Sequence, residues 1–140
     1  MDHERFDRQI RLFGKAGQER IADSYVTIVG AGGTGGHAGQ QLVFLGVRRF
    51  GIIDADHATK SSLNRLVGIR PDDVANKTPK VVIAERMIRE IEPDAEITIV
   101  NDTFLSEAGA AEMSRGSVLF GCMDRDGARL LLNELAHEKL

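Results

Sequence analysis

The fold is decided by the stretch Tyr25-Val-Thr-Ile-Val-Gly30-Ala-Gly32-Gly33-Thr-Gly35-Gly36. Its first five residues are mostly apolar or β-branched and end at a glycine, a pattern typical of a buried strand. Gly30, Gly32 and Gly35 satisfy the spacing G-x-G-x-x-G ahead of a predicted helix. Such a loop permits a tight turn, lets backbone approach phosphates and aims a helix N-terminus at negative charge. The stretch therefore predicts a nucleotide-binding strand–turn–helix unit, although a tight turn that binds nothing satisfies the same spacing.

The rest of the chain alternates strand and helix patterns. Short apolar runs predict further strands over residues 49–54, 96–100 and 117–122. Helical patterns cover residues 40–45 up to Gly46, the segment from N-cap Thr78 and first-turn Pro79 to Pro93, the segment from Ser106 to about residue 114, and residues 126–137. Residues 55–76 are predicted to be an irregular polar connection. This alternation predicts a doubly wound, Rossmann-like α/β fold with a parallel sheet and right-handed crossovers.

The N-terminal residues precede this pattern. Phe6, Ile10 and Phe13 recur at helical spacing, and the helix is expected to end near Gly14, with a second short helix over residues 18–22. We therefore expect an N-terminal helical arm over residues 1–24 and a nucleotide-binding α/β domain over residues 25–140. Four strands are few for this fold, so the domain is expected to be truncated at its C-terminal side.

Composition limits the class of protein. The chain has 140 residues, of which 42% are hydrophobic and 28% charged, as in ordinary globular domains. Lys+Arg 18 against Asp+Glu 21 gives a net charge of −3, which argues against nucleic-acid binding. The single cysteine, Cys122, excludes an internal disulfide and fits a reducing compartment. The charged stretch Met1 to Arg5 leads into no apolar segment, and no run is long enough to span a bilayer, so a cytoplasmic protein without a signal peptide is expected.

Two aspartates follow the second predicted strand. Asp54 closes that strand, where an acid normally accepts hydrogen bonds from ribose hydroxyls. Asp56 lies two residues later and is expected to have only a turn role. Up to this point a nicotinamide-binding domain fits as well as any other nucleotide-binding domain.

Several charged residues point towards phosphoryl chemistry. Asn64 and Arg65 lie in the polar connection, and Lys80, preceded by Lys77, lies in the first turn of a helix, where a cation opposes the helix dipole unless an anion compensates. Asp124, followed by Arg125, comes at the carboxyl end of the fourth strand, where an aspartate suits Mg²⁺ on phosphate oxygens. On these residues alone, solvent-facing cations and an N-cap or turn aspartate remain open alternatives.

In combination, the motifs resemble the adenylation domain of the ubiquitin-activating enzyme-like family, the ThiF/MoeB/HesA type. The resemblance runs from Arg5 to about His137. It rests on six segments in order: Arg5-Phe-Asp-Arg-Gln-Ile-Arg-Leu-Phe-Gly14, Gly30-Ala-Gly-Gly-Thr-Gly35, Leu45-Gly-Val47 with Ile53-Asp-Ala-Asp56, Ser61-Ser-Leu-Asn-Arg65, Thr78-Pro-Lys80 and Cys122-Met-Asp124. The chain departs from the family at Ser62, where asparagine is usual, and at Lys77, where glycine is usual.

The resemblance implies an ATP-dependent adenylyltransferase. Members of the family convert the C-terminal carboxylate of a small ubiquitin-like or sulfur-carrier protein to an acyl-adenylate, using ATP and Mg²⁺. It implies that Asp54 holds the ribose, that Arg65 and Lys80 bind the phosphates, that Asp124 holds the metal, and that Arg8 reaches the partner's site in a homodimer. The expected nucleotide-binding set is Gly30, Gly32, Gly33, Gly35, Asp54, Ser62, Asn64, Arg65, Lys80, Asp124 and Arg125. The alternatives are an NAD-binding oxidoreductase domain and a non-catalytic dimerisation module of the same fold.

Overall fold

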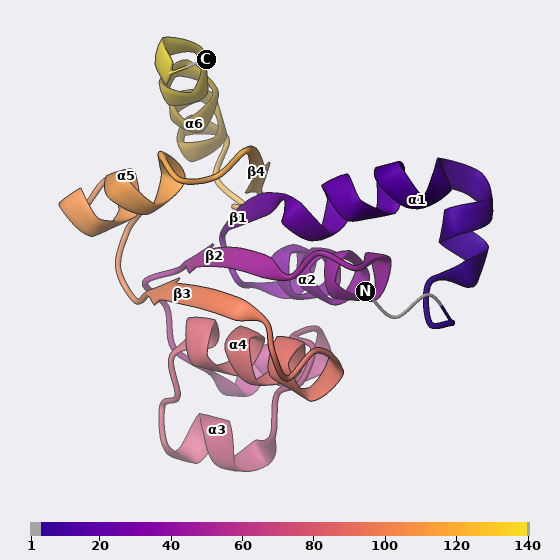
Figure 1. Cartoon of the computed structure of the whole chain (residues 1–140). Helices are drawn as coiled ribbons and strands as arrows, with labels where there is room; N and C mark the ends of the chain where they lie inside the picture. Colours follow the sequence, from indigo (N-terminus) through magenta and orange to yellow (C-terminus); the bar gives the residue numbers. More distant parts are fainter. Residues whose placement is uncertain (1–3, 140) are drawn as a thin grey trace.

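The structure, a computed structural model, describes residues 4–139, so Met1 to His3 of the charged N-terminal stretch lie outside the described residues. Its centre is a four-stranded parallel sheet made of β1 (Tyr25–Val29), β2 (Arg49–Ile53), β3 (Glu96–Val100) and β4 (Val118–Gly121). The strand order is β3-β2-β1-β4 (Figure 1). The predicted doubly wound parallel fold is confirmed, and the chain reverses its direction of travel across the sheet between β3 and β4.

Helices cover both faces of the sheet. Helices α2 (Gly33–Leu45) and α4 (Lys80–Ile91) lie on one face, and α5 (Glu107–Met113) and α6 (Asp126–Lys139) lie on the other (Figure 1). Val26 and Ile28 of β1 point to the first face, while Val29 packs with Met113 and Leu132 on the second. Both faces of β1 are therefore buried, which explains its continuous run of apolar and β-branched residues.

The connection from β2 to α4 is more ordered than the sequence predicts. Residues 55–76 contain the 3₁₀ helix η1 (Lys60–Asn64) and the short helix α3 (Pro71–Ala75), so the prediction of an irregular connection is wrong. Buried Asp73 accepts hydrogen bonds from Arg86 of α4 at 2.6 and 3.0 Å, which ties α3 to α4. Helices of five residues are too short for apolar periodicity to reveal them.

The start of α4 also differs from the prediction. The N-cap is Pro79, and Lys80 is the first helical residue, whereas the sequence predicted Thr78 as the cap. The carbonyl of Thr78 accepts a hydrogen bond from the amide of Ala58 at 2.8 Å, and Pro79 forms an isolated bridge with His57. These contacts with the segment that follows β2 hold Thr78 outside the helix, so the helix begins at Lys80.

The N-terminal helix α1 (Asp7–Asp23) is broken at Gly14, where φ is 72° and ψ is 168°. The predicted break near Gly14 is confirmed. Of the apolar residues at helical spacing, Phe6 is buried, whereas Phe13 is 46% exposed in the single chain. The helix lies towards the amino ends of the strands (Figure 1). None of the described helices is both long enough and apolar enough to cross a membrane.

Candidate nucleotide site

A cavity of about 660 Å³ lies at the carboxyl ends of the strands. Its walls come from the loops after all four strands, from Arg65 just after η1 and from the starts of α2, α4 and α6. They include Val29, Gly30, Gly32, Gly33, Thr34, Ile53, Asp54, Ala55, Asp56, Arg65, Lys80, Asp102, Thr103, Phe104, Leu105, Cys122, Met123, Asp124, Arg125, Gly127, Ala128 and Leu131. Ligands of open α/β sheets bind at this edge, where the order of the strands reverses.

The glycine loop forms the floor of this cavity by close backbone contacts. Gly30 has a φ of 99°, and its amide donates to the carbonyl of Ile53 at 2.8 Å. A Cβ on Gly35 would lie 1.9 Å from the carbonyl oxygen of Gly30, so only glycine lets α2 start this close to β1. The amide groups at the N-terminus of α2 are thereby placed at the cavity, as the predicted phosphate site requires.

Asp54 ties two walls of the cavity together. One carboxylate oxygen accepts the amide of Ala31 in the glycine loop at 2.7 Å, and the other accepts the amide of Asp56 at 2.8 Å. Burial raises the pKa of Asp54 above its usual value, although these backbone hydrogen bonds oppose the shift. A carboxylate offers about four acceptor positions, so the oxygens keep capacity for ribose hydroxyls.

The two predicted phosphate-binding cations both reach the cavity. The aliphatic stem of Arg65 passes over Gly33, where an added Cβ would meet three of its carbons at 3.4 Å. The Arg65 guanidinium donates to the carbonyl of Ser61 at 2.5 Å. The Lys80 ammonium lies 2.6 Å from a carboxylate oxygen of Asp56, so Asp56 has a partner in the cavity and not only the expected turn role.

Three residues of the predicted set lie outside the cavity walls. Ser62 is 3% exposed, and its hydroxyl accepts the amide of Thr59 at 3.2 Å in a capping box of η1. The side-chain oxygen of Asn64 accepts a hydrogen bond from the Arg65 guanidinium at 3.2 Å, so Asn64 contacts a residue of the cavity wall. Gly35 acts through the close approach described above. Arg8 lies on α1 and is likewise not among the wall residues of this chain.

Asp124 and Arg125 line the cavity from the loop between β4 and α6. In the described part of the chain, no group of three or more His, Cys, Asp or Glu side chains is arranged to hold a metal ion. One carboxylate beside a phosphate-binding loop nevertheless fits Mg²⁺, which usually takes one or two protein carboxylates and completes its shell with phosphates and water. Asp124 therefore has the chemistry of a Mg²⁺ ligand at this cavity.

The loop after β3 was missed by the sequence-based prediction. Asp102, Thr103, Phe104 and the half-exposed Leu105 form one wall of the cavity. Their position at the carboxyl end of a strand beside β2 is the signal that could have identified them. Cys122 also lines the cavity, and burial raises the pKa of its thiol, which disfavours the nucleophilic thiolate form.

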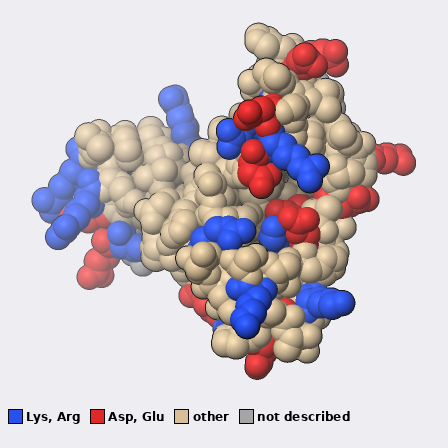
Figure 2. Space-filling view, turned by 180° about the vertical axis from the view of Figure 1, so that it is seen from behind, with Lys and Arg blue, Asp and Glu red and all other residues tan. Residues whose placement is uncertain are grey.

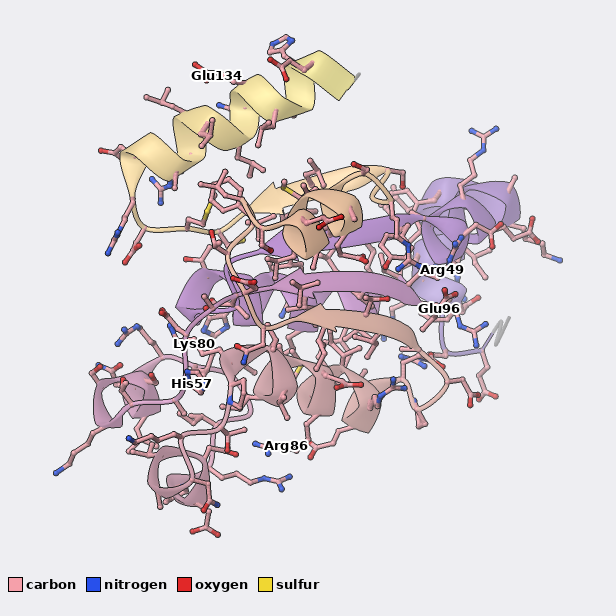
Figure 3. All side chains as sticks on the ribbon, turned by 90° about the vertical axis from the view of Figure 1, so that its left-hand side faces the viewer. Arg49, His57, Lys80, Arg86, Glu96 and Glu134 are labelled. Carbon is pink, nitrogen blue, oxygen red and sulfur yellow. The ribbon has the colours of Figure 1, made fainter. Side chains whose placement is uncertain are left out.

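The charges around the cavity are mixed. Asp and Glu side chains interleave with Lys and Arg over the right-hand part of the molecule in Figure 2. Figure 3 shows Lys80 and His57 near the ends of the strands, with Arg49 and Glu96 at the opposite end of the sheet. This side of the molecule offers local cations for a compact anion and no continuous basic surface.

Known proteins resemble the chain over almost its whole length. Residues 6–140 match the family described as the ThiF family. The sulfur carrier protein ThiS adenylyltransferase of Bacillus subtilis is 33% identical over 137 residues, covering 94% of this chain and 40% of that protein. The tRNA threonylcarbamoyladenosine dehydratase 2 of Saccharomyces cerevisiae is 33% identical over 142 residues, covering 96% of this chain and 31% of that protein.

A solved structure shows the same fold. The crystal structure of E. coli tRNA N6-threonylcarbamoyladenosine dehydratase in complex with ATP has a TM-score of 0.83 and 27% identity. The match covers 99% of this chain and 57% of that chain. The chain thus spans between about a third and somewhat more than half of these relatives.

Proposed function

The chain belongs to the ThiF family, and from this premise we propose that it binds ATP and adenylates the C-terminal carboxylate of a small ubiquitin-like or sulfur-carrier protein. The observation that carries the proposal is the convergence of Gly33, Asp54, Arg65, Lys80 and Asp124 on one cavity. A relative of similar sequence is an adenylyltransferase of the sulfur carrier ThiS, and a relative of similar structure holds ATP.

The residues divide into those that seat the nucleotide and those that meet its charge. The carboxylate of Asp54 would bind the ribose, which does not change during the reaction, and the amides at the start of α2 would bind phosphate oxygens. Arg65 and Lys80 line the same cavity, and in this proposal they neutralise the negative charge that builds up on the phosphates during attack. Mg²⁺ held by Asp124 supplies further charge neutralisation when it is bound.

The chemistry needs no general base from this chain. A carboxylate oxygen of the carrier attacks the α-phosphorus, an oxygen–phosphorus bond forms, and the bond to the bridging oxygen of the β-phosphate breaks, so pyrophosphate leaves. The attacking carboxylate is already ionised at neutral pH. The protein therefore contributes position and charge, which this cavity offers, and no proton transfer.

We also propose that residues 1–24 act as an arm that delivers Arg8 to the site of a second copy in a homodimer. Arg8 is exposed, and its helix lies away from the carboxyl ends of the strands (Figure 1). Within one copy Arg8 is therefore badly placed to meet a triphosphate in the cavity, which favours action in trans over action in cis.

A second candidate is supported by the tRNA threonylcarbamoyladenosine dehydratases among the relatives. Adenylation also turns a substrate oxygen into a leaving group, so the same cavity suits ATP-dependent dehydration of a modified nucleoside. The net charge of −3 and the interleaved charges of Figure 2 disfavour an RNA-binding surface on this part of the protein. An NAD-dependent oxidoreductase is disfavoured by Lys80 and Arg65, which suit a triphosphate.

The test has two steps. Calorimetric titration with Mg-ATP and with NAD should show binding of ATP alone, and tighter binding of NAD would remove the proposal. Exchange of labelled pyrophosphate into ATP should then depend on the carrier protein, and a carrier whose C-terminus is amidated is the matched control, since it has no carboxylate to adenylate. Turnover of ATP that requires tRNA and ignores the carrier would establish the dehydratase alternative. ATP binding by the full-length protein without either turnover would indicate the non-catalytic module.

A further inference from the structure

Asp56 and Lys80 are joined twice, although 24 positions separate them in the sequence. The Lys80 ammonium lies 2.6 Å from the Asp56 carboxylate, and the Lys80 amide donates to the Asp56 carbonyl at 3.0 Å. The bridge between His57 and Pro79 continues this pairing by one residue on each side, and Figure 3 shows Lys80 and His57 close together. Asp56 therefore holds both the first amide of α4 and the end of the Lys80 side chain.

The position of Lys80 makes such a partner necessary. A cation in the first turn of a helix meets the positive end of the helix dipole, which is unfavourable. A lysine side chain also has a long flexible stem, and an unpaired ammonium is free to leave the cavity wall for solvent. The Lys80 side chain is only 15% exposed, whereas the Asp56 side chain is 70% exposed, so the pair keeps the cation on the wall while the Asp56 side chain remains open to solvent.

The same carboxylate works against an anionic ligand. Asp54, Asp56, Asp102 and Asp124 all line the cavity, and their charges repel a polyphosphate. Asp56 also competes with a phosphate for the Lys80 ammonium. Its presence therefore costs nucleotide affinity, and a compensating benefit is expected in the step that Lys80 assists.

We propose that Asp56 is a positioning residue, which holds the Lys80 ammonium at the cavity wall before the nucleotide arrives and then shares it with a phosphate. The inference rests on the proposed function, in which Lys80 contacts the phosphates. Asp56 lowers the affinity for ATP and raises the rate of adenylate formation, because the cation stays in the geometry that the transition state requires.

The first experiment needs no nucleotide. Acylation of lysines by a small anhydride, followed by mass spectrometry, compares Lys80 with the exposed Lys77 as an internal reference. In Asp56→Asn the labelling of Lys80 should rise relative to Lys77, since the ammonium loses its partner. Equal labelling in the variant and the wild type would show that Asp56 does not hold Lys80, whatever reaction the protein catalyses.

The second experiment separates affinity from turnover. Asp56→Asn should bind Mg-ATP about three- to tenfold more tightly, because one repelling charge is removed. Its kcat for carrier-dependent pyrophosphate exchange should fall about ten- to a hundredfold, the range expected for a misplaced group. Asp56→Glu restores the charge and should recover part of the kcat. Asp72→Asn, an exposed carboxylate on α3 outside the cavity, is the matched control and should leave both quantities unchanged.

The outcomes are distinct. Unchanged affinity and kcat in Asp56→Asn would overturn the inference. Weaker ATP binding together with a lowered unfolding midpoint would also overturn it, because it would show that Asp56 only supports the local fold. Failure of the wild type to bind ATP would refute the proposed function instead, and the labelling of Lys80 would then still decide whether Asp56 holds it.

Discussion

The glycine loop offers the sharpest quantitative test of how this cavity is built. In Gly35→Ala the added Cβ would lie 1.9 Å from the Gly30 carbonyl oxygen and 2.9 Å from its carbon, whereas real Cβ atoms do not approach closer than about 3.0 Å. To avoid this clash, the start of α2 and the end of β1 must move apart by about 1 Å. Both atoms belong to backbone, so no flexible side chain can absorb the change.

The expected cost follows from opposing contributions. Overpacking a tightly packed, buried contact lowers the free energy of unfolding by about 1–3 kcal/mol, and a clash with backbone belongs at the upper end of that range. Alanine in a helix returns up to about 1 kcal/mol relative to glycine. The net loss is therefore about 2 kcal/mol, which lowers the unfolding midpoint by about 4–8 °C in a domain of this size. ATP affinity should fall as well, because the amides of α2 move away from the cavity.

Gly32→Ala is the matched control in the same loop. Gly32 has an extended backbone, and an added Cβ there would have no atom within 4 Å. The unfolding midpoint should therefore stay within the change that about 0.5 kcal/mol produces, as for an ordinary surface substitution. Because the Cβ occupies space beside the cavity, ATP affinity should nevertheless fall. Thermal unfolding and calorimetric titration of both variants test these expectations. A wild-type midpoint in Gly35→Ala would refute the reasoning about close approach.

Three further predictions follow from the charged residues. Burial raises the pKa of Asp54, so the folded protein binds a proton at this carboxylate more readily than the unfolded chain does. The stability that Asp54 contributes is therefore greatest below its pKa in the unfolded chain, and it is lost as the pH rises through its pKa in the folded protein. In urea unfolding between about pH 3.5 and 7, the free energy of unfolding of the wild type should therefore decrease relative to that of Asp54→Asn as the pH rises. A difference that stays constant with pH would contradict the raised pKa of Asp54. Asp124→Asn should lower the kcat of carrier-dependent exchange more than ATP affinity, and normal exchange at saturating ATP would mean that Asp124 has only a structural role in the loop after β4. Mixed dimers of Arg8→Ala and Asp124→Ala subunits should regain part of the lost activity if Arg8 acts in trans, while confirmed subunit exchange without recovery would place Arg8 in cis or outside the reaction.

Local patterns along the chain were sufficient to predict much of the fold. The apolar run from Tyr25 to Val29, the spacing of Gly30, Gly32 and Gly35 and the alternation of later strands with helices specify a parallel sheet with a nucleotide loop at its carboxyl edge. Each of these signals acts within a few residues, through side-chain periodicity and the backbone freedom of glycine. Asp54, Lys80 and Asp124 could be placed at one edge for the same reason, since carboxyl ends of parallel strands meet there.

Only the tertiary structure decided which side chains face one another. The pairing of Asp56 with Lys80 depends on how the β2–α4 connection folds back, and residues 24 positions apart show no local sign of it. The same connection turns the hydroxyl of Ser62 into a capping box and keeps Thr78 out of α4. The wall formed by Asp102 to Leu105 likewise arises from packing of the loop after β3 beside β2. Such contacts join distant segments, so their geometry is set by the packing of the crossovers and not by any pattern within one segment.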